Sequence, residues 1–477
     1  MSHPRAAGES AAPTFESITS LPVSADEAWN WHARPGAFER LSPPWRNLEI
    51  LERPERLENG CRLIFRIRQG PASIRWVALH EDVEPGRGFT DVQEKGPFAR
   101  WRHRHGFEPE GDGSTCRLVD RIHYALPGGI LGRAVFGGRI RDDLSALFAH
   151  RNRVLLQDLA MHRRYASDRP LRIAIAGASG LIGTTLGAQL ETGGHEVIRV
   201  VRRQPGAGEV GWTSEGRWIE GQRLENLDAF VDLAGAGIAD GRWSPSRKRL
   251  LRSSRVDRVR AVVAALGTLD TPPKVFLCAS GVGIYGDTGH ETVTESSPLS
   301  SEGFLAPLAR DWEAAAAEAS ELGARVVHLR FGVVMSPRGG ALARMAPPYL
   351  AGVGAVPGDG RQLLSWITAD DTAGAIVHGI FTPELEGPVN VTSPRAAPLG
   401  DVGKALGKAL RRPHWGTLPA AGLRMALGQM AEETVLQSTA AAPTRLLETG
   451  YEFRNTELVE CFRELYGRAV GPAPEVA

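Results

Sequence analysis

The chain has little of what marks disulfide-rich, zinc-bound or membrane proteins. Its four cysteines lie far apart and include no C-x-x-C pair, which argues against a disulfide framework and against a structural zinc site. No apolar run reaches the roughly 18 residues needed to span a bilayer. The N-terminal stretch MSHPRAAGESAAPTF lacks the apolar segment of a signal peptide and is expected to be a disordered lead. Together these absences predict a cytoplasmic, soluble protein.

An excess of charge of one sign is also missing. The chain has 56 basic and 55 acidic side chains, so neither nucleic acid nor an anionic membrane is expected as a partner. At 477 residues it is too long for one ordinary core. Its length predicts two or three domains. The patterns described below favour three, over residues 14–165, 170–390 and 391–470.

The first of these domains has the pattern of an antiparallel sheet followed by a helix. The segment Arg62–Arg68, RLIFRIR, alternates apolar and basic residues with the period of a half-buried strand, and four more segments read the same way. A short helix is expected after Ser24, a good N-cap, and a long one over about 132–162. This order of elements resembles the START-like, or polyketide cyclase/SRPBCC, helix-grip superfamily. The resemblance implies an α+β domain with a pocket for an apolar ligand.

Two histidines of this domain, His103 and His105, share one face of a strand in the segment WRHRH. They are of a type that binds metals, but the sequence suggests no third ligand nearby, and a solvated strand face explains the pattern equally well. No metal is predicted.

A different signal begins at Leu171, where LRIAIAGASGLIGTTLGAQL reads as a strand, a glycine-rich turn and a helix to about Thr192. The first glycine permits the tight turn, the second lets the backbone approach a pyrophosphate, and the third lets the helix pack on the strand. A second strand at 195–201 completes a βαβ unit. The turn contributes these candidate cofactor-binding residues: Gly177, Ser179, Gly180, Leu181, Ile182 and Gly183.

The end of the second strand indicates which cofactor is preferred. An NAD enzyme places an acidic residue there for the ribose 2′-hydroxyl, whereas this chain has Arg202 and Arg203 after Val201. A guanidinium favours a 2′-phosphate, so NADP is predicted over NAD. Further buried strands are expected within 229–238 and 274–286, giving a doubly wound parallel sheet.

A series of motifs now carries a second resemblance. GASGLIG, DLAGAGIADGRW, SGVGIYGDTG, RDWEAAA, LRFGVVMSPRGGAL, GDGRQLLSWITADD and GPVNVTSP occur in the order seen in the extended short-chain dehydrogenase/reductase superfamily. More narrowly, they resemble its sugar-nucleotide-epimerase-like subfamily, which has its own C-terminal domain. The resemblance covers about 171–466 and implies a Rossmann fold, a small helical substrate-side lobe and NAD(P)-dependent oxidoreduction or epimerisation. It adds Leu233, Ala234 and Gly235 as cofactor-binding candidates.

The sequence departs from the superfamily at the catalytic positions. No Y-x-x-x-K is present: the Tyr position falls near Ala306 and the Lys position near Arg310. The Ser/Thr position holds Gly281, with Ser280 beside it. The nearest remaining phenol is Tyr285, so the catalytic candidates are Tyr285, Ser280 and Arg310. A packing role is the alternative for Tyr285.

Several smaller expectations concern the rest of the chain. The arginine that many relatives use on the substrate diphosphate is replaced by Leu364, which leaves Arg361 and Gln362 as substrate-side candidates. The basic run 247–260 reads as an amphipathic helix with a solvated face. The pair at 370–371 is expected to cap a helix, and the core of the C-terminal lobe is expected to contain Met425, Leu427 and Met430.

Two functions remain open on the sequence alone. One is an NADP-dependent epimerase or oxidoreductase acting on a small molecule such as a nucleotide sugar, with an apolar ligand in the first domain. The other is a noncatalytic NADP-binding sensor or assembly factor, favoured by the missing Tyr and Lys. The sequence also leaves open whether the chain forms a homodimer.

Overall fold

The computed structural model describes residues 15–70 and 72–468. The chain divides into two compact units, the first ending at Leu159 and the second beginning at Ala160. Phe15, the last residue of the disordered lead expected over 1–15, instead begins a strand, and residues 1–14 lie outside the described residues. So do the outermost residues of the expected domain limits, residue 14 and residues 469–470. In the described ranges, no helix has both the length and the apolar character needed to cross a membrane.

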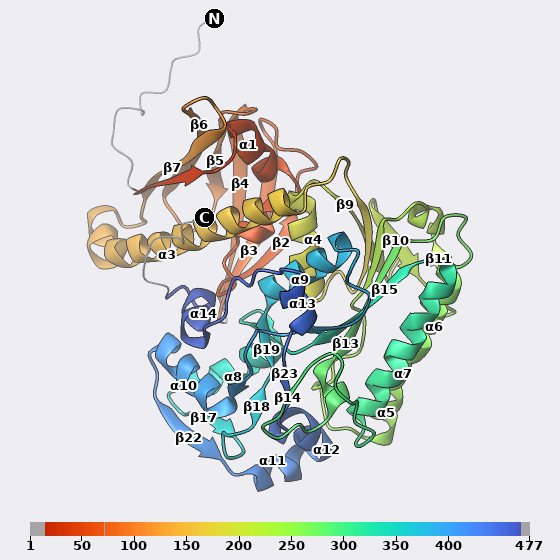
Figure 1. Cartoon of the computed structure of the whole chain (residues 1–477). Helices are drawn as coiled ribbons and strands as arrows, with labels where there is room; N and C mark the ends of the chain where they lie inside the picture. The colour runs from red at the N-terminus through yellow and green to blue at the C-terminus, as the bar shows by residue number, and fades with distance from the viewer. Residues whose placement is uncertain (1–14, 71, 469–477) are drawn as a thin grey trace, which may run out of the picture. The chain divides into compact units, whose positions relative to one another are not determined.

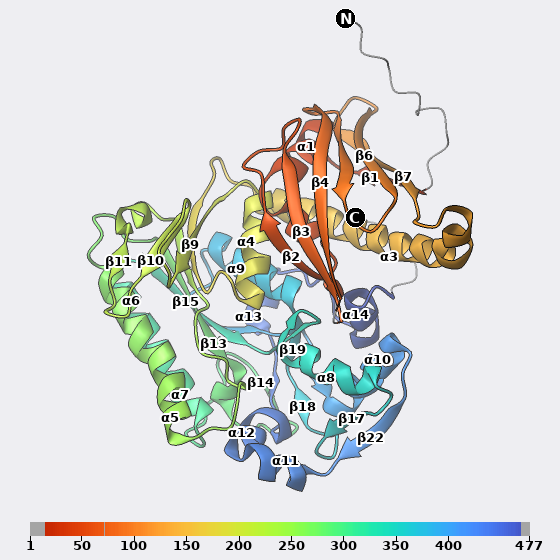
Figure 2. The same ribbon diagram turned by 180° about the vertical axis from the view of Figure 1, so that it is seen from behind.

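The first unit is a seven-stranded antiparallel sheet in the order β1-β7-β6-β5-β4-β3-β2, with the long helix α3 lying along it (Figure 1; Figure 2). A second layer of contacts comes from helix α1, whose buried Trp29 and Trp31 pack in the same core as Leu155 and Leu159 of α3. The elements are β1 (Phe15–Leu21), α1 (Ala25–Ala33), α2 (Ala37–Leu41), β2 (Asn47–Glu52), β3 (Arg62–Gln69), β4 (Ala72–Glu84), β5 (Gly88–Lys95), β6 (Arg100–Glu110), β7 (Thr115–Ala125) and α3 (Gly129–Arg164).

Local sequence signals account for several of these elements. The Ser24 hydroxyl accepts a hydrogen bond from the Glu27 amide at 3.2 Å, which confirms the expected N-cap of α1. In β3 the side chains of Leu63 and Phe65 are buried while Arg62 is exposed, as the alternation predicts. Helix α3 begins three residues earlier than the expected start at 132 and ends two residues later than the expected 162.

The second unit has an eight-stranded sheet in the order β11-β10-β9-β8-β12-β13-β15-β20. All neighbouring strands in this order are parallel except β10 and β11. The order reverses direction between β8 and β12, as in a Rossmann sheet, and ligands bind at such a point. Its strands are β8 (Arg172–Ala176), β9 (Glu196–Val201), β10 (Glu209–Trp212), β11 (Trp218–Ile219), β12 (Ala229–Asp232), β13 (Val275–Gly281), β15 (Arg325–Phe331) and β20 (Gly387–Val391).

Helices cover both faces of this sheet (Figure 1). On one face α6 and α7 bury side chains such as Val259 and Trp312 against the strands. On the other face α4 and α9 do so with Leu186 and Ile376. The helices are α4 (Leu181–Thr192), α5 (Pro245–Arg252), α6 (Arg258–Leu266), α7 (Leu305–Ala317), α9 (Ala369–Phe381) and α13 (Thr444–Glu448). The doubly wound parallel fold predicted from the sequence is confirmed.

A smaller lobe of the second unit is built from two stretches of the chain. Its core joins Tyr349 of α8 and Val356 of β17 to Leu406 of α10 and Phe462 of α14, so part of the stretch 333–366 packs with residues beyond 391. The remaining elements are β14 (Thr292–Val293), β16 (Val333–Ser336), α8 (Gly340–Leu350), β17 (Gly354–Pro357), β18 (Leu363–Leu364), β19 (Trp366–Thr368), β21 (Ala397–Pro398), α10 (Leu399–Leu410), β22 (His414–Leu418), α11 (Ala420–Leu427), α12 (Gln429–Ala431), β23 (Ala440–Ala441) and α14 (Leu458–Leu465).

Two details in this region differ from expectation. Met425 is 79% exposed, and Met430 is buried in the core of the eight-stranded sheet, against which Leu427 also packs, so these three residues do not form the core of the lobe. The N-cap of α9 is Thr368, whose hydroxyl accepts a hydrogen bond from the Asp371 amide at 3.0 Å. Neither Asp370 nor Asp371 is the cap, because both already lie in the first turn, where acidic side chains favour the helix dipole.

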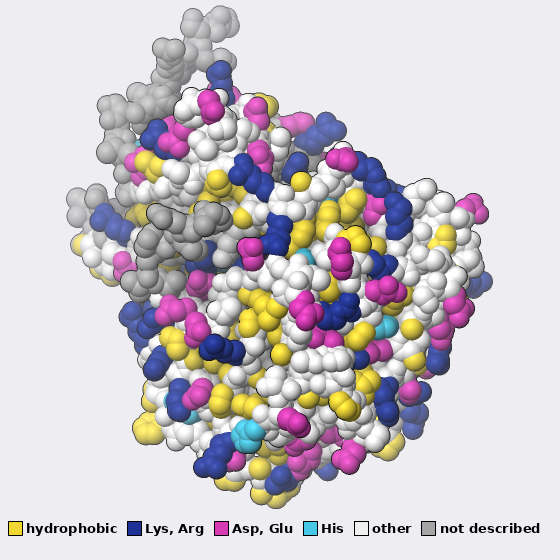
Figure 3. All heavy atoms as spheres, viewed as in Figure 1, with side chains coloured by type: hydrophobic (Ala, Val, Ile, Leu, Met, Phe, Trp, Pro, Cys, Tyr) yellow, Lys and Arg dark blue, Asp and Glu magenta, His cyan; other side chains and the backbone are white. Residues whose placement is uncertain are grey.

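Basic and acidic side chains are interspersed over the surface seen in Figure 3, as the near-zero net charge of +1 predicts. The basic run 247–260 is helical as expected, but a π-helical turn, Ser253–Asp257, interrupts it between α5 and α6. Arg255, within this turn, is buried.

Candidate active site

A cavity of about 230 Å³ lies where the sheet order reverses, at the carboxyl ends of β8 and β12. The turn after β8 forms one wall, Leu233 after β12 contributes another side, and β16 and α8 close it. Its lining residues are Gly177, Gly180, Leu181, Ile182, Gly183, Leu233, Val333, Val334, Gly340 and Ala341. Six of the predicted cofactor-binding residues are therefore brought together around one cavity.

The glycines of the turn are required by close backbone contacts. Gly177 has φ +83°, and a Cβ there would lie 2.9 Å from the Leu233 carbonyl carbon. A Cβ on Gly183 would lie 2.3 Å from the Gly177 carbonyl oxygen, closer than real Cβ atoms come. Helix α4 begins after Gly180 with no side-chain cap. The first backbone amides of a helix have no intrahelical acceptor, and here no side chain caps them. These amides, and the positive end of the helix dipole, face the cavity and its occupant.

The two arginines after β9 are in different states. Val200 pairs with Ala176 in parallel register, so the chain leaves β9 at the carboxyl end of the strands, where the glycine turn also lies. Arg203 donates two hydrogen bonds to Glu209, at 2.7 and 2.6 Å. Arg202 is exposed, and its side chain makes no hydrogen bond or ion pair with the residues that the structure describes. Arg202 is thus the guanidinium that is available to a ligand.

Two arginines of the basic run hold the loop after β12. Arg258 pairs with the fully buried Asp232 and also donates to the Ala234 carbonyl at 2.9 Å. Arg255 donates to the Ala236 carbonyl at 2.9 Å and stacks on Trp312 with 5.1 Å between its Cζ and the ring centre. Burial lowers the pKa of Arg255 to about 10, and Arg258 and another nearby arginine add to the effect. The expectation of a wholly solvated helix face is therefore wrong for these two residues.

The remaining cofactor candidates lie next to the cavity rather than in its lining. The Ala234 amide donates to Asp232 at 3.1 Å, which fixes the loop. Gly235 is exposed and faces the Arg255 guanidinium, since a Cβ there would lie 3.3 Å from its Cζ. Ser179 is exposed at the tip of the turn. The cofactor-binding role of Ser179, Ala234 and Gly235 therefore stays a prediction.

Tyr285 is buried in a polar network. Its hydroxyl donates to Asn390 Oδ1 at 2.7 Å and accepts from Arg330 Nη1 at 2.9 Å. Burial raises the pKa of Tyr285, although Arg330 acts in the opposite direction. Arg330 is in turn held by Glu313 through two hydrogen bonds of 2.8 Å. Both partners of the phenol therefore come from the protein, and its role as an acid or base stays a prediction.

The other two catalytic candidates, Ser280 and Arg310, differ in their contacts. The Ser280 hydroxyl donates to Glu313 Oε1 at 2.8 Å, so Ser280 belongs to the Tyr285 network. Arg310 is exposed on α7 and does not join this network, while Ala306, at the expected Tyr position, is buried. The structure thus brings Ser280 and Tyr285 together and leaves Arg310 apart.

The substrate-side pair also divides. Gln362 is buried and donates its amide to the carbonyls of Pro357 and Val435, at 2.8 and 3.2 Å. Arg361 is exposed, and its backbone amide donates to Asp359 at 2.9 Å. Only Arg361 has its polar head in solvent, where an anionic group is reachable.

Four residues that line the cavity were not predicted from the sequence, nor were Glu313, Arg330 and Asn390 of the Tyr285 network. Val333, Val334, Gly340 and Ala341 line the cavity, although they stand inside the quoted motif LRFGVVMSPRGGAL. Glu295 also belongs to this network, because it accepts a hydrogen bond from the Asn390 backbone amide at 3.0 Å. Their distance along the chain from the glycine turn and from Tyr285 hides these contacts from a local reading.

Comparison with known families agrees with this geometry. Residues 173–391 match the NAD dependent epimerase/dehydratase family, and residues 418–465 match a domain of unknown function, DUF1731. Residues 21–148 match the polyketide cyclase/dehydrase and lipid transport family.

Individual relatives and solved structures agree as well. An epimerase family protein of Mycobacterium bovis is 40% identical over 289 residues, which cover 60% of this chain and 95% of the relative. A nucleoside-diphosphate sugar epimerase of Corynebacterium glutamicum is similar over 95% of this chain and 90% of its own, with 32% identity and a TM-score of 0.78. Human epimerase family protein SDR39U1, solved with NADPH, has 30% identity and a TM-score of 0.58 over 62% of this chain and 99% of its own. The chain belongs to the NAD-dependent epimerase/dehydratase family, and its N-terminal part is a polyketide cyclase-like domain.

Proposed function

We propose that this protein binds NADP at the turn between β8 and α4 and uses it to oxidise, reduce or epimerise a small molecule, with nucleotide sugars as the substrate class. The observation that carries the proposal is the cavity formed by Gly177, Gly183 and Leu233, where a Cβ on either glycine meets backbone. Small-molecule sites are commonly about 300–1,000 Å³. A cavity of 230 Å³ therefore suits part of a dinucleotide, and the rest of the dinucleotide would lie across the carboxyl ends of the neighbouring strands.

Each part of the site has a separate task in this proposal. The first amides of α4 bind the pyrophosphate, and the loop held by Arg255 and Arg258 supports the cofactor from the β12 side. Arg202 reaches the ribose 2′-phosphate. When bound, the nicotinamide supplies or accepts hydride. The NADPH present in the structure of the human relative supports NADP over NAD.

We also propose that Arg361 reaches an anionic group of the substrate, since its guanidinium is exposed while the neighbouring Gln362 amide is used by the backbone. The first domain is proposed to bind an apolar ligand. Support comes from its match to a family that includes lipid transport, and from an aromatic cluster that contains Trp76, Trp101 and Phe148.

The proposed cofactor preference is tested by replacing each arginine after β9. We expect the unmodified protein to bind NADPH at least about tenfold more tightly than NADH, equivalent to ~1.4 kcal/mol. Arg202→Ala should remove most of this preference. Arg203→Ala is the matched control: its guanidinium is bound to Glu209, so its loss should change the ratio far less. Fluorescence titration with both cofactors gives the ratio of NADPH affinity to NADH affinity for each protein. Equal affinities in the unmodified protein would contradict the proposal.

The contacts of Tyr285 favour a second, noncatalytic function. The Tyr285 hydroxyl is hydrogen-bonded to Asn390 and Arg330, while Ala306 stands at the position of the usual catalytic phenol. A protein of this kind would bind NADP without transferring hydride. Net reduction is measured as NADPH oxidation with a panel of carbonyl compounds. Epimerisation consumes no net cofactor, so it is measured as conversion of nucleotide sugars to their epimers in the presence of NADP. A protein that does neither is noncatalytic towards these substrates.

If turnover is found, Tyr285 is the residue on which it should depend. We expect Tyr285→Phe to lower turnover about 100-fold, the usual scale for loss of a general acid or base. NADPH affinity should stay nearly unchanged. Tyr349→Phe is the control, because it removes another buried phenol, one bonded to His414 at 2.8 Å, from the lobe core. Full turnover in a folded Tyr285→Phe protein would place the proton relay elsewhere.

A further inference from the structure

The first unit contains a buried row of histidines and aspartates that its sheet register creates. Asp91 of β5 is the cross-strand partner of His103 on β6, and Asp120 of β7 is the partner of His105 on β6. The expectation that no third ligand accompanies the two histidines is therefore wrong. The aspartates were missed because strand register, unlike strand period, cannot be read from one segment.

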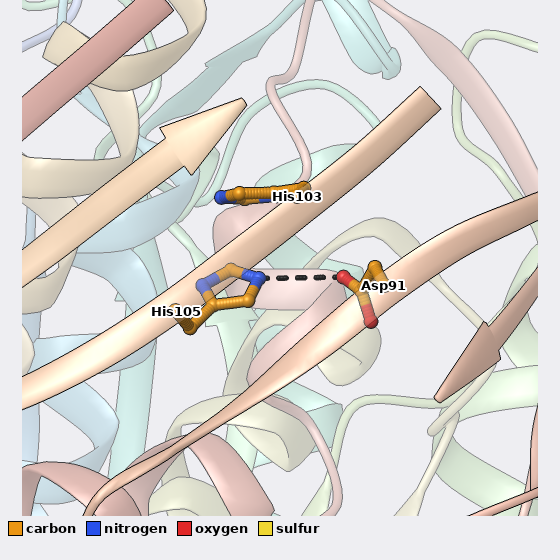
Figure 4. Close-up of side chains that lie close together, drawn as sticks. All are labelled: Asp91, His103 and His105. Atoms are coloured by element: carbon orange, nitrogen blue, oxygen red, sulfur yellow. Dashed lines mark hydrogen bonds and ion pairs between the residues drawn. The ribbon is translucent and has the colours of Figure 1, made fainter. Parts of the chain in front are cut away.

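The ligand atoms of three of these residues are close enough for one ion. A nitrogen of each imidazole and an oxygen of Asp91 all lie within 4.8 Å of one another, and His105 Nε2 lies 3.3 Å from Asp91 Oδ2 (Figure 4). Ligands around a tetrahedral zinc ion, at about 2.0–2.1 Å from the metal, lie about 3.3 Å apart. Coordination therefore requires each pair of ligand atoms to approach by at most about 1.5 Å.

Asp120 occupies the place of an orienting carboxylate. Its Oδ1 lies 2.9 Å from His103 Nε2 and 2.8 Å from His105 Nδ1, so each imidazole keeps its second nitrogen for a metal. Metal-binding histidines usually have their other nitrogen on a carboxylate in this way. A second contact, 3.2 Å between His80 Nε2 and Asp91 Oδ1, orients Asp91.

The surroundings also suit a bound cation. His103, His105 and Asp120 are at most 5% exposed, and Phe89 stacks on His105 with ring centres 4.2 Å apart. The buried Asp120 carboxylate and the partly buried Asp91 carboxylate beside it need positive charge near them. The Asp91 side chain is 26% exposed, which leaves an entry path for an ion.

We propose that Asp91, His103 and His105 bind a divalent first-row transition-metal ion, with Asp120 as the carboxylate that orients both imidazoles. Two imidazoles and one carboxylate are a ligand set that Zn²⁺ and Fe²⁺ both accept. The proposal concerns the first unit alone and is independent of the proposed function of the second.

The test is direct titration of the chelator-treated full chain with Zn²⁺ by calorimetry and with Co²⁺ by visible absorption. We expect one ion per chain, micromolar or tighter binding, and a rise in Tm on addition of Zn²⁺. Asp91→Asn and His105→Gln should each weaken binding at least tenfold, and Asp120→Asn by about 10- to 100-fold, the range for loss of an orienting partner.

A matched control comes from the same sheet. His123 is on β7, an odd number of residues from Asp120 and so on the opposite face, and His123→Gln should bind the metal like the unmodified chain. Circular dichroism checks that each variant folds. If the unmodified chain takes up neither ion saturably, the row holds a proton in place of a metal and the proposal is overturned. It is also overturned if Asp91→Asn and His105→Gln bind as the unmodified chain does.

Discussion

Gly183→Ala is expected to abolish saturable NADPH binding, whereas Gly187→Ala, one turn later in the same helix, is expected to leave it intact. The added methyl group of Gly183→Ala would lie 2.3 Å from the Gly177 carbonyl oxygen and 2.8 Å from the Ala178 Cα. Both of these atoms are backbone, so the turn itself must open. Opening moves the amides at the start of α4 away from the pyrophosphate they would bind.

Gly187→Ala tests whether the effect is specific to the turn. A Cβ at Gly187 has its nearest neighbour, Val197 Cγ1, at 3.9 Å, an ordinary contact. An alanine inside a helix is favoured over glycine by roughly 0.5–1 kcal/mol, so this variant should be slightly more stable than the unmodified chain. Fluorescence titration with NADPH measures both variants. An affinity of Gly183→Ala within threefold of the unmodified chain would contradict the role given to the turn.

Glu313→Gln is expected to lower the free energy of unfolding by about 3–5 kcal/mol, the cost of breaking a buried ion pair by removing one partner. The side chains of Glu313 and Arg330 are only 12% and 4% exposed. Without the carboxylate charge, the Arg330 cation stays buried beside Tyr285 with neutral partners. Urea unfolding followed by circular dichroism measures the change.

The matched control is a second Glu–Arg pair, whose Glu318 directly follows the last residue of α7. Glu318 lies 3.1 Å from Arg260, with side chains 44% and 51% exposed. Exposed pairs contribute only about 0–1 kcal/mol, so Glu318→Gln should be nearly neutral. Equal losses in the two variants would show that burial does not set the strength of the Glu313–Arg330 pair.

The Tyr285 network also bears on how the catalytic candidates are read. Ser280, Tyr285 and Glu313 form one connected set of hydrogen bonds with Arg330 and Asn390. Removing any member disturbs the others, so a loss of turnover has to be compared with a loss of stability in the same variant. For this reason the Tyr285→Phe experiment includes a control phenol outside the network.

The sequence by itself determined the features that depend on neighbours along the chain. The glycine spacing at 177–183 predicted the turn and the start of α4, because the close contacts of Gly183 are with Gly177 and Ala178, at most six residues away. Ser24 predicted the beginning of α1, and the alternation at Arg62–Arg68 predicted β3. The parallel, doubly wound class followed from strands and helices that alternate along 171–391.

Only the tertiary structure decided which of these residues meet. The partners Tyr285 and Asn390 are 105 positions apart, and Asp91 reaches the two histidines through the pairing of β5 with β6. The same holds for Val333 and Gly340, which line the cavity together with Gly177, and for the pairing of Arg203 with Glu209, which Arg202 does not share. Period and spacing describe one element at a time, whereas register, layer packing and ion pairing are set between elements once the whole core has formed.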